Sequence, residues 1–343
     1  MAAGSNYIPT IHTPLVMHGQ FEQPAYAQLV AAGVIDTNTL AETVVKGGDI
    51  VDIPVMDKAP AMTRMAIESD TEATPTKVGT TNDKGVVLRA YNLMSWKDTD
   101  KIRTGNDYES KLSLSFGQRL AEYKIIKMCD LLEGAMQAID TPSADCHTRN
   151  VFNNITGSQP TANLATVDNI RRTRELLADK QFELETILIH STVFNDLLRD
   201  VIETYKIDIA GGQAVLVGKL AVLLGIKNWV ITDLMPTRFL ANSTSSGAGA
   251  TVYNTYLLGK GAILTADQAV PLFETERQAR VPAGQTNLAM RTHFVMHPRG
   301  IPWGGANNPD LQQQRAAASW TASGYQDHRE ILVAQLVSNG GQF

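Results

Sequence analysis

The sequence lacks the features that would place a protein outside a cytosol-like compartment. Its 343 residues include only two cysteines, Cys129 and Cys146, which is too few for a disulfide framework and predicts two reduced thiols. No stretch reaches the length of about 18 apolar residues that a membrane-spanning helix needs. The first residues have no basic stretch followed by an apolar one, so we expect no secretory signal.

An excess of positive charge is also missing. Charged residues make up 19% of the chain and the net charge is −5, which excludes an extended basic surface for nucleic acid. Arg171, Arg172 and Arg174 form one small basic cluster, for which a solvated helix face is a more common explanation than a DNA contact. Because 43% of the residues are hydrophobic, the chain can bury a sizeable core and form two domains.

Catalytic signatures are scarce. His293 and His297 lie four residues apart in a segment that alternates like a strand, without the glutamate of a zinc protease motif. The glycine- and serine-rich stretch 242–250 lacks the Gly-Lys-Ser/Thr ending of a phosphate loop, and no serine lies in a nucleophile elbow. We therefore expect no catalytic residue, cofactor or metal. An α/β metal-dependent enzyme that uses the His293–His297 region stays open as an alternative.

The dominant feature is a long stretch without proline, residues 104–139. Its apolar residues recur at helical spacing, and Asp140-Thr141-Pro142 follows as a stop signal. The pattern predicts one helix of about 33 residues, roughly 50 Å long, with one buried face. Gly117 and Gly134 argue against a straight rod. The predicted stripe contains Tyr108, Leu112, Phe116, Leu120, Tyr123, Ile126, Leu131, Ala135 and Ile139.

Two alternating segments, 50–55 and 86–93, predict a pair of strands joined by an unusually long connection. The connection is polar, and Asn82-Asp83-Lys84-Gly85 is a turn signal that closes it. A compact domain rarely carries such a connection without purpose, so we interpret it as a hairpin that reaches a neighbouring subunit. A flexible surface flap is the alternative.

The remaining chain predicts an irregular alternation of strands and helices, which is typical of an α+β fold with one dominant helix. Residues 1–45 are broken by prolines and carry few side chains that would build a core, apart from a short helix at 25–32. Helices are predicted at 166–177, from Ser191 onward, and at 310–320. Strands are predicted at 184–190, 226–232, 252–261, 263–264, 288–296 and 328–337.

The order of these parts resembles the major capsid protein of tailed double-stranded DNA bacteriophages, which has the Hong Kong 97-type fold. The resemblance rests on local strings in the right order: Gly48–Pro54, Val230–Asp233, Thr255–Ala262, Glu274–Arg277 and Phe294–Gly300. It implies a structural protein that assembles into hexamers and pentamers of an icosahedral shell around packaged DNA. An encapsulin-like cellular compartment of the same fold is a further alternative.

The resemblance also implies a division of the chain and a set of partners. Residues 1–45 would form an N-terminal arm, 46–97 an extended loop, 98–183 a peripheral domain with spine helix 104–139, and 184–343 an axial domain with a late return to the periphery. No long segment precedes the hairpin, which favours a separate scaffolding protein. A portal is a further expected partner, and whether a cementing protein also binds is left open by the sequence. The protein would enclose DNA without sequence-specific binding, in a virion capsid assembled in the host cytoplasm.

Charge pairs at such interfaces fix register more than they add affinity. The candidate residues for these contacts lie in the extended loop and around the long helix, and for each of them a solvated charge is the alternative. They are Asp57, Lys58, Glu68, Asp70, Lys77, Arg103 and Arg119.

Overall fold

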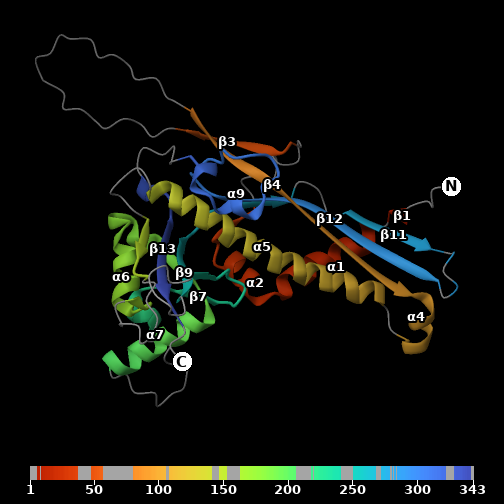
Figure 1. Ribbon diagram of the computed structural model, residues 1–343, viewed down its shortest axis with the longest axis horizontal. Helices are drawn as coiled ribbons and strands as arrows, with labels where there is room; N and C mark the ends of the chain where they lie inside the picture. The colour runs from red at the N-terminus through yellow and green to blue at the C-terminus, as the bar shows by residue number, and fades with distance from the viewer. Residues whose placement is uncertain are drawn as a thin grey trace, which may run out of the picture.

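The structure, a computed structural model, consists of two β-sheets connected by one long helix, α5 (Figure 1). It describes residues 6–7, 9–37, 48–56, 80–105, 108–140, 147–152, 163–205, 220–240, 250–267, 272–278, 284–321 and 328–340, together with isolated positions at 218, 280 and 282.

Helix α5 spans Tyr108–Asp140, which confirms the predicted long helix. Residues 98–104 form a separate short helix, α4, and Gly105 with a φ of 62° ends it. The expectation of one buried face holds for the first half of α5 but is wrong for the second. Every residue from Met128 to Met136 is buried, because other elements cover this half of the helix on several sides.

The two glycines of α5 are the points where other backbones come closest. A Cβ on Gly117 would overlap the carbonyl oxygen of Val16, and a Cβ on Gly19 would overlap that of Leu114. Helix α1 therefore packs on α5 with almost no side chain between the two backbones. Gly134 has the same role near the end of the helix, where an added Cβ would overlap the carbonyl oxygen of Gln314.

The first sheet has seven strands and one face covered by α1 and α5 (Figure 1). Its central path is β1-β11-β12-β10-β2, and β4 pairs with both β12 and β3. The predicted apolar alternation of 288–296 is confirmed, because the side chains of this set lie on the buried face of β12. The strands are β1 Asn6–Tyr7, β2 Ile35–Asp36, β3 Ile50–Met56, β4 Thr80–Lys97, β10 Ile263–Asp267, β11 Leu272–Gln278 and β12 Gln285–Pro298.

The second sheet has six strands in the order β5-β13-β9-β6-β7, with β8 beside β9. Helices α6 and α7 bury their apolar faces against it in a separate core cluster. The strands are β5 Thr148–Asn150, β6 Leu184–Ile189, β7 Asn228–Ile231, β8 Arg238–Leu240, β9 Ala250–Gly259 and β13 Val333–Asn339. The helices are α6 Val167–Glu175 and α7 Ser191–Tyr205.

The expectation that the N-terminal segment has few core side chains is wrong for its described part, 9–37. Helix α1, Pro9–Glu22, and helix α2, Pro24–Ala31, lie along α5, and they bury Val16 and Leu29 completely. Pro14 lies inside α1, because packing on α5 stabilises a helix where proline alone predicts a break. The buried Lys124 adds a polar contact, since its Nζ lies 3.0 Å from Asp267 Oδ1 and 3.4 Å from Gln20 Oε1 of α1.

The structure corrects three further predictions from the sequence. The turn signal at 82–85 lies inside β4, where Asp83 pairs with Ile53 of β3. The predicted helix 310–320 is a short helix, α9 Leu311–Arg315, followed by the 3-10 turn η3 Ala317–Ser319. The predicted strand 328–337 begins with the 3-10 turn η4, His328–Glu330, before β13 starts.

The chain visits the two sheets more than once. Strands β10, β11 and β12 return to the first sheet after β9, and β13 ends in the second sheet. The predicted boundary at residue 183 does not coincide with this division, because Val167, Ile170 and Leu177 are buried in the core of the second sheet. The four-part division concerns the assembled protein and stays a prediction.

Gly117→Ala provides a test of the α1–α5 contact. Helix propensity alone would stabilise this variant by about 1 kcal/mol. We expect the opposite sign, a loss of about 3 kcal/mol in the free energy of unfolding, because the methyl group would overlap the backbone of α1. Urea unfolding of the unassembled subunit measures the change. Lys111→Ala, at an exposed position of the same helix, should change stability by less than about 0.5 kcal/mol. A Gly117→Ala variant as stable as the parent would contradict this packing.

Candidate functional site

The structure describes only part of the predicted contact set. Asp57, Lys58, Glu68, Asp70 and Lys77 lie outside the described residues. Arg103 is exposed in the last turn of α4. Arg119 is exposed on α5, where its Nη1 donates to Glu122 Oε2 at 2.8 Å within the same helix. A role of these residues in contacts between subunits stays a prediction.

The base of the β3–β4 hairpin is held by a buried ionisable pair that the sequence did not reveal. His297 Nε2 lies 2.8 Å from Asp83 Oδ1, and the Gly300 N–H donates to Asp83 Oδ2 at 2.7 Å. Both side chains are almost fully buried, and the ring of Trp320 stacks on that of His297. The start of β4, which forms one side of the hairpin base, is therefore fixed to the end of β12.

A second contact holds the same place. The backbone N–H of Trp303 donates to the carbonyl oxygen of Lys84 at 2.8 Å, and the rings of Trp303 and Trp320 meet edge to face at 4.9 Å. Asn-Asp-Lys-Gly is typical of turns, so the sequence predicts a turn where the structure has the buried Asp83. No local signal distinguishes the two situations, since its partner His297 is distant in sequence.

The two histidines considered for a metal site have different environments. His297 is committed to Asp83, whereas His293 is half-buried opposite Arg89 in the β4–β12 register. Within the described ranges, no group of three or more potential metal-binding side chains is present. The pair gives no support to the alternative of a metal-dependent enzyme.

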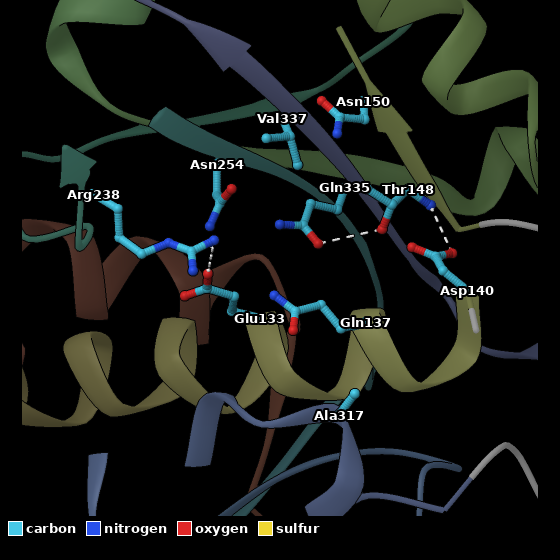
Figure 2. A pocket seen from close by; sticks show the side chains of 10 residues that line it. All are labelled: Glu133, Gln137, Asp140, Thr148, Asn150, Arg238, Asn254, Ala317, Gln335 and Val337. Atoms are coloured by element: carbon cyan, nitrogen blue, oxygen red, sulfur yellow. Dashed lines mark hydrogen bonds and ion pairs between the residues drawn. The ribbon is translucent and has the colours of Figure 1, made fainter. Parts of the chain in front are cut away.

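A polar hollow of about 500 Å³ lies between the last turns of α5 and the second sheet (Figure 2). Glu133 enters it from α5 beside Arg238 of β8, while Asn254 of β9 and Gln335 of β13 line the opposite side. At its far end Asp140 Oδ1 accepts hydrogen bonds from the backbone N–H groups of residues 147 and 148. The remaining lining residues are Gln137, Thr148, Asn150, Ala317 and Val337.

A network of charged side chains extends from this hollow to α9. Arg315 Nη2 lies 2.6 Å from the fully buried Asp130, and its Nε lies 3.4 Å from Glu133 Oε2. Arg238 Nη2 lies 2.6 Å from Glu133 Oε1. Burial raises the pKa of Glu133, against the opposing effect of Arg238 and Arg315. The network joins α5 to α9 and to β8, so it fixes the second sheet and the segment containing α9 to the same helix.

The buried ring of His147 has a related position beside the sheet. Its Nδ1 lies 2.6 Å from the carbonyl oxygen of Val333, and its Nε2 lies 3.2 Å from His328 Nδ1. Burial lowers the pKa of His147. The carbonyl contact assigns the proton to Nδ1, so Nε2 accepts a hydrogen bond from His328.

The small basic cluster on α6 makes its contacts within the subunit. Arg171 Nη2 lies 3.2 Å and Arg172 Nε 2.8 Å from the carboxylate oxygens of Asp168. Arg174 is buried, and its Nε donates to the carbonyl oxygen of Gln181 at 2.6 Å. Arg174 therefore serves the fold, whereas Arg171 and Arg172 are exposed and paired with an acidic residue of the same helix, as expected for a solvated helix face.

Comparisons with known proteins find similarity to major capsid proteins of phages. A family model described as Gp13-like, major capsid protein 13-like, matches residues 54–328. The major capsid protein of Bacillus phage SPP1 is 24% identical over 335 residues, which span 96% of this chain and 95% of that relative.

Solved structures with the same fold include two phage capsids. The capsid of Ralstonia phage GP4 matches with a TM-score of 0.51 at 11% identity, and the match covers 90% of this chain and 87% of the GP4 chain. The capsid of Cyanophage Pam1 has a TM-score of 0.51 at 13% identity, with 92% and 93% coverage. At these identities the two structures establish the fold alone.

Asp83→Asn is a test of the hairpin anchor. The neutral amide has one acceptor oxygen and one donor group, whereas the Asp83 carboxylate faces both the Gly300 N–H and the buried His297 ring, so the contact with one of them would be lost or reversed in direction. We expect a loss of about 2 kcal/mol in the free energy of unfolding. Asp52→Asn, on the exposed side of the adjacent strand β3, should cost less than about 0.5 kcal/mol. Equal effects in urea unfolding would argue against the buried anchor.

His147 predicts sensitivity to acid. Because its pKa is lowered in the folded state, the unfolded chain binds a proton that the folded chain does not. Stability is then complete above the ordinary histidine pKa of about 6.5 and is lost as the pH falls through the folded-state pKa, by up to ~1.4 kcal/mol per pH unit. The free energy of unfolding, measured in urea at several pH values in this range, should fall less steeply with decreasing pH for His147→Gln than for the parent. A His147→Gln variant with the same pH dependence as the parent would contradict this prediction.

Proposed function

The chain belongs to the Gp13-like family of major capsid proteins, and from this membership we propose how its parts divide the construction of the shell. It is a structural protein of a tailed-phage capsid with the Hong Kong 97-type fold, and it self-assembles into the capsomers of an icosahedral shell. It is not an enzyme. The family match does not support the encapsulin-like compartment or the metal-dependent enzyme.

In this proposal residues 46–97 extend over the next subunit of a capsomer, and 1–45 act as the arm that reaches a neighbour. The observation that carries the first role is the buried anchor of Asp83 on His297. An anchored base fixes the place from which the two hairpin strands leave the sheet, so this part needs no further ordering when contacts with another subunit form. The peripheral role of 98–183 and the axial role of 184–343, with a late return to the periphery, complete the proposal.

Charged residues in the loop and around the spine helix are proposed to set the register between subunits. Asp57, Lys58, Glu68, Asp70 and Lys77 act from the loop, as complementary charges do in polar interfaces. Arg103 and Arg119 act from the helices, and both are exposed, which supports their availability.

The proposed partners follow from shell construction. A separate scaffolding protein guides assembly in the host cytoplasm, a portal occupies one vertex, and a cementing protein strengthens the surface. The enclosed DNA needs no sequence-specific contact. The pairing of Arg171 and Arg172 with Asp168 supports the proposal that the subunit binds DNA only weakly.

Assembly of the purified chain is the direct test. The chain is expressed alone and with the scaffolding protein of its phage, then observed by light scattering and negative-stain electron microscopy over a wide range of concentrations. Rings or closed shells are expected, and the scaffold should narrow their size distribution. A chain that stays monomeric under both conditions would contradict the proposal.

Arg119→Glu separates assembly from folding. Because Arg119 is exposed and its ion pair with Glu122 lies on the surface, the unfolding free energy should change by less than about 1 kcal/mol. The shell yield at low salt should fall, since a register contact changes sign. Arg172→Glu on α6 is the matched control, with a similar exposed ion pair, and should assemble like the parent. Equal shell yields for all three proteins would remove Arg119 from the contact set.

A further inference from the structure

Strand β4 has a long edge that no other strand covers in the part of the chain that the structure describes. It pairs with β3 from Thr80 to Val86 and with β12 from Val87 to Lys97. Beyond Val87, the side of β4 that faces away from β12 has no partner strand among the described residues. Figure 1 shows this part of β4 running beside β12 as far as α4.

Two backbone hydrogen bonds determine which residues point toward the open edge. The Val87 N–H donates to the carbonyl oxygen of Asp49 at 3.0 Å, on the side of β3. The Asp98 N–H donates to the carbonyl oxygen of Gly284 at 3.1 Å, on the side of β12. Because backbone groups alternate between the two sides of a strand, odd-numbered residues point away from β12. The open edge therefore presents the N–H and C=O groups of Arg89, Tyr91, Leu93, Ser95 and Lys97.

The chain closes other edges of the same sheet. The two-residue strand β1 pairs with β11, and the two-residue strand β2 pairs with β10. Natural proteins protect exposed edges in such ways, or with prolines and bulges. The open edge of β4 contains no proline, and the side chains at its centre, Tyr91 and Leu93, are 60% and 52% exposed. An edge of this length and composition is a template for another strand.

We propose that a second copy of this chain adds an extended segment to the edge of β4 between Arg89 and Lys97. This inference rests on the proposed shell, in which every subunit has other copies beside it. In strand addition, main-chain hydrogen bonds supply affinity and alternate side chains supply specificity. Tyr91 is a suitable anchor, because aromatic residues dominate binding energy at interfaces. The guanidinium of Arg291 lies 5.8 Å from its ring centre and is itself paired with Glu274 at 2.9 Å.

Hydrogen exchange measured by mass spectrometry tests the occupied edge. The unassembled subunit and shells made from this chain alone are compared for peptides that cover 88–97. The amides of the odd-numbered residues should exchange freely in the subunit and become protected at least tenfold in the shell. Amides of the even-numbered residues, which bond to β12, should be protected in both. Protection of the odd-numbered amides already in the subunit would overturn the inference, because the edge would then be satisfied within one chain.

Proline substitutions at neighbouring positions separate the edge from the sheet. Ser95→Pro removes an N–H that points outward, and proline is tolerated at such positions of edge strands. This variant should melt cooperatively, yet its shell yield should fall about tenfold for each hydrogen bond of about 1.4 kcal/mol that is lost between copies. Ser95→Ala should assemble normally. Met94→Pro removes an N–H directed at β12 and should destabilise the subunit itself.

The outcomes distinguish this inference from the shell on which it rests. Shells that form normally while the odd-numbered amides still exchange would overturn strand addition and leave the proposed function intact. Protection that appears only when a different protein is added would overturn the second copy as the occupant. If Ser95→Pro fails to fold, the exchange data on the parent protein decide alone. A parent chain that never forms shells would overturn both.

Discussion

The structure depends on how closely two backbones can approach helix α5. Glycine is required at 117 because α1 lies against it, and at 134 because Gln314 lies against it. Such contacts have no side chain that can adjust, so they fix the positions of α1 and of the segment containing α9 within a small tolerance. Each sheet is then placed relative to this helix, the first through β12 and the second through the charges around Glu133. The helix is therefore a common reference for elements distant in sequence.

Buried polar pairs give this packing its direction. Lys124 with Asp267, Asp83 with His297, and Arg315 with Asp130 each connect elements far apart in the chain. Apolar contacts tolerate sliding, whereas a buried charge tolerates only the position in which its partner is present. These pairs thus favour one arrangement of α5, the β3–β4 pair and the two sheets. A subunit that must fit many identical neighbours benefits from such uniqueness.

Strong local periodicity made α5, the β3–β4 pair and β12 predictable from the sequence. Helix α1 was missed because Pro14 is a local breaker, and the contact that stabilises α1 is made with Gly117, about a hundred positions away. The role of Asp83 was missed for the same reason, since its partner His297 lies on a distant strand. The second half of α5 is buried on several sides because other elements pack around it. The pattern of apolar residues in one helix does not predict such tertiary packing. The contacts between subunits involve surfaces that only a neighbour completes.

The continuity of β4 has a mechanical consequence. The strand runs for 18 residues, roughly 60 Å at about 3.3 Å per residue, from the hairpin to α4 without interruption. A pull on the hairpin along this direction loads the ladder with β12 in shear, so that all pairs from Val87 to Lys97 resist together. A pull across the strand would instead open the pairs one after another. The subunit is therefore stiff along β4 and compliant across it, and a tensioned lattice built from it should yield first where force crosses the strand.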